Sequence, residues 1–247
     1  MPELVNPVTK GEKTVKNVFW ALQFYCLSSL AYSLRQGHSE NIKLSLLGFV
    51  LLFTPWLVER LFSIKLSAVL KTVFMFFSLG SMTGHVYNVY YLFPRWDKIL
   101  HTLCGVLAAA VGYGAVGALD AENRGKHSRR LCVFAAVCFS LFVASVWEFF
   151  EFGLDMLFGM DMQNDRIISS FSSYLLGAEM GMMERLTGIS SVIINGIDLN
   201  LGGYLDIGLI DTMLDMIVCT LGAIGYCFVV CHDKWLAKMP WLVPRPA

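Results

Sequence analysis

The stretch that decides the fold is LCVFAAVCFSLFVASVWEFFEFGL, residues 131–154, in which the first charged side chain is Glu148. A helix that crosses the hydrocarbon core needs roughly 20 apolar residues, and this stretch supplies them. Glu148 and Glu151 interrupt the run only near its end. The sequence therefore predicts a transmembrane helix that carries ionisable groups close to one membrane surface.

The whole chain shares this apolar character. Its 247 residues are 56% hydrophobic and 15% charged, whereas a soluble domain has about 25% charged residues. Nineteen basic residues balance nineteen acidic ones, so the chain lacks the basic excess of a nucleic-acid-binding protein. The seven cysteines form no CxxC pair, which argues against a disulfide framework or a zinc ribbon. The sequence thus favours a polytopic membrane protein.

Five further stretches reach the length and hydropathy of a membrane span, although some do so loosely. The six predicted spans are residues 17–34, 43–62, 66–92, 97–119, 131–154 and 208–231. The third is long enough to tilt or kink, and Gly80 and Gly84 offer places to bend. Because no internal repeat or low-complexity linker occurs, we expect a single all-α membrane domain over residues 1–247.

An insert of residues 155–207 separates the last two spans. Its apolar patches, such as IISSFSSYLLG and ISSVIING, are too short to cross the bilayer, so we expect them to be interfacial or re-entrant. The segment 1–16 is too polar for a removable signal peptide.

Lysine and arginine predict the orientation. Thirteen of them fall in segment 1–16, the second and fourth loops and the tail 232–247, with Arg124 and Lys126 in the fourth loop. The other six fall on the opposite side, some of them in the insert. Both termini are therefore predicted to face the cytoplasm and the insert to face outward.

Acids and histidines recur at one predicted level in four of the spans. At 1.5 Å per residue, they lie roughly 24–33 Å from the cytoplasmic edge, near the outer interface. Asp97 and His101 are an i,i+4 pair, as are Asp211 and Asp215; the third set, Glu148, Glu151 and Asp155, has i,i+3,i+7 spacing. Each set therefore shares a helix face, and like charges on one face call for a cation or shared protons.

Carboxylates with imidazole suit a divalent metal such as Zn, Mn or Fe, with Mg or Ca if carboxylates dominate. The metal ligands expected from this pattern are His101, Glu148, Glu151 and Asp215. Asp97 would orient His101 or share the metal. Asp211 or Asp155 would act as a general base on metal-bound water, whose pKa falls toward ~7 on zinc.

A phosphate of the substrate would be held by Lys98 or Arg166. The alternative is that charges at helix ends simply lie in the headgroup layer, with Asp97 as an ordinary N-cap. His85, which is surrounded by tyrosines, is then a hydrogen-bonded structural residue.

Three blocks carry a resemblance to a known family. WDKILHTLCG, WEFFEFGLDMLFGMDMQND and DTMLDMIVCTLGAIGY resemble the signature blocks of a largely uncharacterised family of bacterial inner-membrane proteins, the YjdF-like family. That family shares its layout of motifs with VanZ-like proteins, which are associated with teicoplanin resistance. The resemblance covers roughly residues 80–230 and implies an acid/His centre at the outer leaflet of the bacterial inner membrane. The matching positions are Asp97, Lys98, His101, Glu148, Glu151, Gln163, Asp165, Asp211 and Asp215.

Three functions compete. The leading hypothesis is a membrane-embedded, metal-dependent hydrolase or transferase that acts on a lipid or lipid-linked envelope substrate, with Gln163, Asp165, Arg166 and His85 as further substrate contacts. The second is an ion- or proton-coupled transporter, since intramembrane carboxylates serve as proton relays; the acids cluster at one interface, however, and inverted repeats are absent. The third is a non-catalytic envelope accessory protein. The substrate, the metal and the oligomeric state are left open.

Overall fold

A computed structural model describes residues 7–119 and 127–247. Arg124, Lys126 and residues 1–6, which enter the predicted orientation and N-terminal segment, lie outside the described residues. The chain divides into two compact units. The helical unit contains the residues up to Ala144 together with Met216–Ala247, and the insert unit contains Ser145–Asp215.

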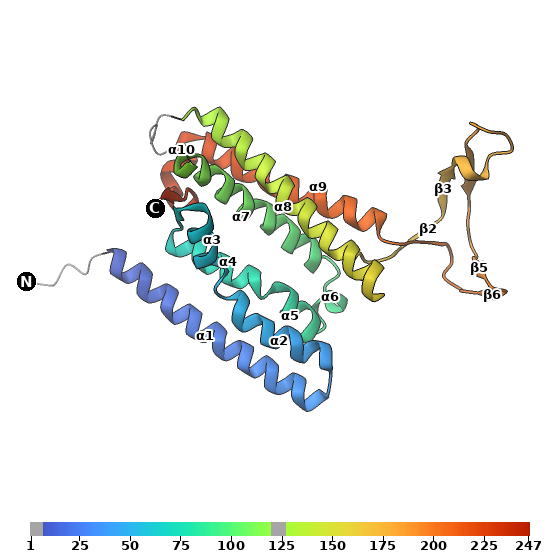
Figure 1. Cartoon of the computed structure of the whole chain (residues 1–247), viewed down its shortest axis with the longest axis horizontal. Helices are drawn as coiled ribbons and strands as arrows, with labels where there is room; N and C mark the ends of the chain where they lie inside the picture. The colour runs from blue at the N-terminus through green and yellow to red at the C-terminus, as the bar shows by residue number, and fades with distance from the viewer. Residues whose placement is uncertain (1–6, 120–126) are drawn as a thin grey trace, which may run out of the picture. The chain divides into compact units, whose positions relative to one another are not determined.

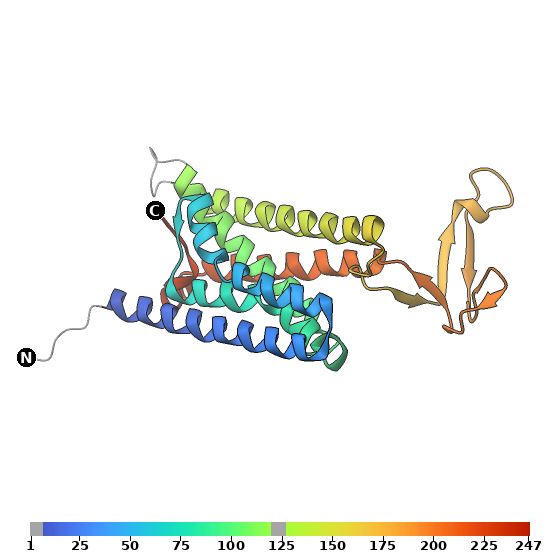
Figure 2. The ribbon, with the colours of Figure 1, turned by 60° about the horizontal axis from the view of Figure 1, so that its bottom comes forward.

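Helices make up nearly all of the helical unit, as Figures 1 and 2 show from two directions. The helices up to residue 119 are α1 (Pro7–Gln36), α2 (Ser39–Leu51), α3 (Thr54–Phe62), α4 (Ala68–Ser78), α5 (Gly80–Val86), α6 (Val89–Leu92) and α7 (Trp96–Leu119). The later ones are α8 (Arg129–Phe158) and α9 (Leu209–Cys231), which belong to both units, then α10 (Asp233–Lys238) and the 3-10 turn η2 (Pro240–Leu242).

In the described part of the chain, three helices are long and apolar enough to cross a membrane: α7, α8 and α9. The pair α2 and α3, bent by 47°, passes the same test together and makes a fourth if it is one span. A helical membrane protein is thus supported. The predicted number of six spans is not confirmed by length and composition.

The predicted third span, 66–92, is divided into α4, α5 and α6. The first break falls at Leu79, directly before Gly80, where the sequence predicts a bend. The second falls at Asn88, whose φ of 56° is left-handed. Asparagine tolerates that conformation better than most residues because its short polar side chain can hydrogen-bond locally.

Close backbone contact holds α7 against α9. A Cβ atom added at Gly105 would lie 1.9 Å from the carbonyl oxygen of Cys219, and one at Gly222 would lie 2.1 Å from that of Thr102. Glycine is therefore required on both helices, as in the small-residue interfaces of membrane helices. Ala109, on α7, is fully buried in the same region.

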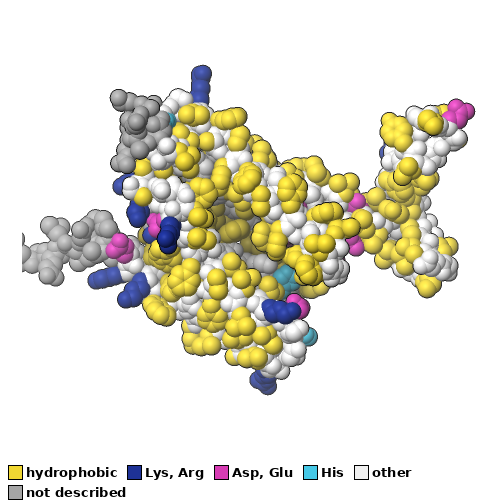
Figure 3. Space-filling model, viewed as in Figure 1, with side chains coloured by type: hydrophobic (Ala, Val, Ile, Leu, Met, Phe, Trp, Pro, Cys, Tyr) yellow, Lys and Arg dark blue, Asp and Glu magenta, His cyan; other side chains and the backbone are white. Residues whose placement is uncertain are grey.

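Apolar side chains cover most of the helical surface seen in Figure 3. The interior of the helical unit contains separate apolar clusters, one around Met75 and Met82, one around Ala109 and Tyr226, and one around Leu70 and Leu107. An outer surface that remains apolar after such a core has formed is suited to lipid rather than to water.

Short antiparallel strands form the insert, which the all-α prediction does not include. They pair as β2 (Arg166–Ile168) with β7 (Tyr204–Asp206), β3 (Ser170–Ser173) with β4 (Glu184–Thr187), and β5 (Ile193–Ile194) with β6 (Ile197–Asp198). The 3-10 turn η1 (Tyr174–Leu176) follows β3. Asn195 and Gly196 both have positive φ, as a two-residue hairpin turn requires, so Asn-Gly is the sequence signal for the third pair.

One strand pair belongs to the helical unit. β1 (Ile64–Lys65), between α3 and α4, pairs antiparallel with β8 (Arg245–Pro246), near the C-terminal end. The tail predicted as a cytoplasmic extension over 232–247 is therefore folded onto the helices.

Candidate functional site

The last turns of α8 carry two of the predicted metal ligands. Glu148 and Glu151 are 4% and 7% exposed, whereas Phe149 and Phe152 between and beside them are exposed. This alternation follows from the helical period, which puts the two glutamates on one face and the aromatic rings on the other. Oε1 of Glu151 accepts a hydrogen bond of 2.7 Å from the indole N–H of Trp147.

Asp155, one further turn along the same face, holds the start of the insert. Its Oδ1 accepts a 2.6 Å hydrogen bond from the backbone N–H of Met162, and its Oδ2 a 3.0 Å bond from that of Gln163. The carboxylate thereby ties the chain that leaves α8 back to the end of the helix. Its role as a general base stays a prediction.

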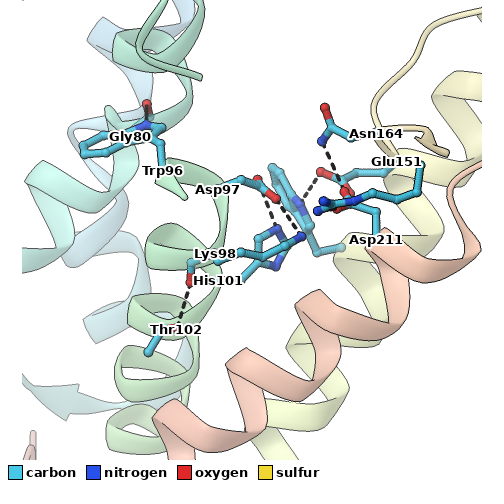
Figure 4. A network of polar contacts seen from close by, with 11 residues as sticks. Gly80, Trp96, Asp97, Lys98, His101, Thr102, Glu151, Asn164 and Asp211 are labelled. Atoms are coloured by element: carbon cyan, nitrogen blue, oxygen red, sulfur yellow. Dashed lines mark hydrogen bonds and ion pairs between the residues drawn. The ribbon is translucent and has the colours of Figure 1, made fainter. Parts of the chain in front are cut away.

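The first turns of α9 carry two more buried carboxylates. Asp211 is 2% exposed and Asp215 is 1% exposed. Oδ1 of Asp211 accepts from a guanidinium N–H of Arg166 at 3.0 Å, and Oδ2 accepts from the side-chain amide of Asn164 at 3.2 Å. Figure 4 shows the contact between Asn164 and Asp211. The predicted phosphate ligand Arg166 is therefore engaged with a carboxylate of its own unit.

A strand pair positions these contacts. Arg166 begins β2 and faces Asp206 at the end of β7. Oδ2 of Asp206 accepts a 2.9 Å hydrogen bond from the backbone N–H of Ile210, which caps the first turn of α9. The side-chain amide of Gln163 donates to the hydroxyl of Thr212. The two ends of the insert are thus joined beside the start of α9.

Asp165, also in the insert, is exposed. Partial desolvation, with the negative charges of Asp161, Asp206 and Asp155, raises the pKa of its carboxyl. Burial and the nearby negative charges therefore favour the protonated form of Asp165. Its contact with a substrate stays a prediction.

The helical unit brings together three other predicted residues at the start of α7. Nζ of Lys98 lies 3.2 Å from Oδ2 of Asp97, and Nε2 of His101 lies 3.7 Å from Oδ1 of the same carboxylate; Figure 4 shows both contacts. At 3.7 Å the second is an ion pair when the imidazole is protonated and is too long for a hydrogen bond. The indole N–H of Trp96 donates to the carbonyl of Gly80 at 3.0 Å.

His85 lies on α5, with its ring centroid 4.8 Å from that of Tyr90. This contact shows packing against one tyrosine ring, and the hydrogen bond of the structural alternative stays a prediction. Its predicted contact with a substrate is not tested by this packing.

Two polar contacts are not predicted from the sequence. One is the hydrogen bond of Trp147 to Glu151, because Trp147 stands in an apolar run that gives no sign of it. The other involves Glu59, which the sequence marks only as a membrane boundary. Oε2 of Glu59 lies 2.9 Å from Nζ of Lys71, and Oε1 accepts a 2.8 Å bond from the backbone N–H of Leu66. The sequence does place an acid and a base in consecutive predicted spans. Their pairing could be predicted only if the geometry of the turn between those spans were known.

The site has a definite chemical capacity. Glu148, Glu151, Asp211 and Asp215 are carboxyl groups buried on two helix ends of one unit. A buried carboxyl group is either protonated or, if it is ionised, paired, hydrogen-bonded or bound to metal. Oxygen ligands of this kind suit a hard or borderline divalent cation.

Comparison with known proteins places the chain in a family. Residues 18–234 match the model of the family described as "Predicted membrane protein (DUF2238)". Because the match covers most of the chain, the protein belongs to this family. No curated protein and no solved structure matches it.

Proposed function

We propose that the chain is a multi-pass protein of the bacterial inner membrane with six spans, both termini in the cytoplasm and the insert outside. Membership in a family of predicted membrane proteins and three or four candidate spans among the described residues support the membrane assignment. The bent pair α2 and α3, α1 and the divided segment α4 to α6 supply the remaining spans. The orientation rests on the positive-inside distribution, and the likeness to VanZ-like proteins rests on the three sequence blocks.

We further propose that the buried carboxylates at the ends of α8 and α9 bind a divalent cation. The observation that carries this proposal is the burial of Glu148, Glu151 and Asp215 on faces of two helices joined by the β2–β7 pair. Zinc, manganese, iron and magnesium are the candidate ions. We include His101 as a fourth ligand because the sequence predicts that it lies at the same depth in the membrane as these carboxylates.

Asp211 is a positioning residue in this proposal. Both of its oxygens accept hydrogen bonds, from Arg166 and Asn164, so it orients the start of α9. The substrate is a lipid or a lipid-linked envelope compound, because the centre is predicted at the outer interface. A divalent cation held there would supply Lewis-acid polarisation of a water or of a phosphoryl oxygen of that substrate.

The test is metal analysis of the full chain, purified in detergent and loaded in turn with each candidate ion. We expect near-stoichiometric metal that is lost in the Glu148→Gln/Glu151→Gln double variant. The matched control is Glu179→Gln/Glu184→Gln, which removes the same charge from two exposed positions of the insert and should keep the metal. Absence of metal under every loading condition would refute the centre, as would equal loss in both double variants.

The alternatives are separated by other readouts. Uptake of protons or ions into proteoliposomes that depends on Glu148 would favour a coupled transporter. Metal bound without turnover of any lipid, combined with capture of an envelope protein by the insert, would favour an accessory protein. For His101, a His101→Ala variant with unchanged metal affinity would remove it from the ligand set.

A further inference from the structure

Two adjoining cavities open beside the β1–β8 strand pair of the helical unit. The first has a volume of about 380 Å³, and the second a volume of about 330 Å³. Lys65 lines both of them. The first is lined on one side by Lys65, Leu66 and Ser67 and on the other by Pro240, Trp241, Val243 and Arg245. This region belongs to neither the acidic site nor the insert.

The charges around the first cavity are of one sign. The register of the strand pair places Lys65 directly opposite Arg245, and like charges in that position destabilise a strand pair. Among the described residues, neither side chain forms an ion pair with a carboxylate, and no acidic side chain lines the first cavity. Among its described lining residues, the first cavity therefore presents two cations and no acidic side chain, a charge pattern that suits an anion.

The nearest buried acid does not supply that anion. Glu59 lines the second cavity, but its Oε2 is paired with Lys71 at 2.9 Å and its Oε1 accepts from the backbone of Leu66. Arg60 adds another cation to the wall of the second cavity. Among the described side chains that line the two cavities, the cations Arg60, Lys65 and Arg245 therefore outnumber the one carboxylate, Glu59, which Lys71 already pairs.

The cavity wall is held in place by several contacts of the tail. The hydroxyl of Tyr226 donates to the carbonyl of Leu242 at 3.3 Å, and the backbone N–H of Ala247 donates to the carbonyl of Ser63 at 2.9 Å. A Cβ atom added at Gly114 of α7 would lie 2.7 Å from Cβ of Pro244, so the tail packs closely against that helix. A preformed wall lowers the entropic cost of binding.

We propose that Lys65 and Arg245 bind the phosphate group of an anionic ligand in this cavity. Ser67, the N-cap of α4, places the positive end of that helix dipole at the cavity wall. Trp241 and Val243 provide an apolar wall that suits the glycerol and the first methylenes of a phospholipid. The phosphate belongs either to an anionic lipid headgroup, as in basic pockets between membrane helices, or to free phosphate.

The experiment measures binding to the full chain in a zwitterionic detergent. The probes are dioctanoyl phosphatidylglycerol, dioctanoyl phosphatidylcholine and inorganic phosphate, each titrated against the thermal unfolding temperature. We expect saturable stabilisation by phosphatidylglycerol, at least tenfold weaker apparent affinity in Lys65→Gln/Arg245→Gln, and a loss of affinity at high salt. Saturation by phosphatidylglycerol alone identifies a lipid site; equal saturation by inorganic phosphate, with competition between the two, identifies a phosphate site.

The control is Lys234→Gln/Lys238→Gln, which removes two cations from α10, outside both cavities. It should bind like the unmodified chain. Without ligand, Lys65→Gln/Arg245→Gln should unfold at the same temperature or higher, because a repulsion has been removed. Equal weakening in both double variants would overturn the proposal, as would stabilisation by phosphatidylcholine as strong as by phosphatidylglycerol, or no saturable effect of any probe.

Discussion

Glu59 in the helical unit and Asp211 in the insert unit are two buried carboxylates with different surroundings. Each contacts a basic side chain and also accepts from a further N–H donor. For Glu59 the further donor is the backbone of Leu66, and the Lys71 side chain is only 20% exposed. For Asp211 both donors are side chains of the insert, and Arg166 is 45% exposed.

This difference separates a structural ion pair from an adaptable one. Backbone donation and a largely buried lysine fix the environment of Glu59 for as long as the fold persists. Side-chain donors can rotate away and be replaced by another cation, and Asp215 lies one turn further along the same helix as Asp211. The second arrangement is the one expected where a ligand enters.

The largest expected effect is on the Glu59 pair. Lys71→Met leaves a buried carboxylate without its cation and should lower the free energy of unfolding by about 3 kcal/mol. Thermal unfolding in detergent measures this. The control Lys43→Met removes an exposed lysine whose pair with Glu40 is highly exposed, so its effect should stay below about 0.5 kcal/mol. Similar losses in the two variants would show that the Glu59 pair is not structural.

A smaller effect is expected for the Asp211 pair. Arg166→Gln should cost about 1 kcal/mol, because solvent screens the half-exposed guanidinium and Asn164 still donates. Hydrogen exchange at the first turns of α9 should report the loss locally. Arg185→Gln, an exposed arginine of β4, serves as the control and should leave that exchange unchanged. If Arg166→Gln lowered the free energy of unfolding more than Lys71→Met does, the Asp211 pair rather than the Glu59 pair would be the structural one.

The smallest effect on stability is expected at Asp165 in the insert, and it depends on pH. Because the pKa of Asp165 is raised in the folded chain, its ionisation opposes folding above that pKa. Asp165→Asn should therefore raise the unfolding temperature slightly at neutral pH. The gain should fade as pH falls from the folded-state pKa toward the unfolded-state pKa, and it should vanish below both. A gain that grows on acidification would contradict the crowding of acids around Asp165.

Helical periodicity makes much of the helical unit predictable. The apolar runs of α7, α8 and α9 give their positions to within a few residues. Spacing alone places Glu148 and Glu151 on one face of α8, and the structure shows that this face is buried. The breaks within 66–92 are only half predictable, because Gly80 marks one of them whereas the left-handed Asn88 does not stand out among its neighbours.

The insert is where prediction from the sequence falls short. Its strands are two to four residues long, so the alternation of apolar and polar residues that marks a strand is hardly repeated. Only Asn195-Gly196 indicates a hairpin from the sequence. The contacts of Asp211 with Asn164 and Arg166 depend on the register of β2 with β7, which joins residues far apart in the chain. Neither periodicity nor spacing contains that information.

The strand pair of β1 with β8 also constrains the order of folding. Residues 64 and 65 leave the ribosome long before residues 245 and 246, and α9 must be synthesised between them. This contact between distant parts of the chain therefore closes only after the last long helix has been made, and loop closure over such a separation is slow. Completion of this short ladder therefore requires that the chain has been synthesised at least as far as Pro246.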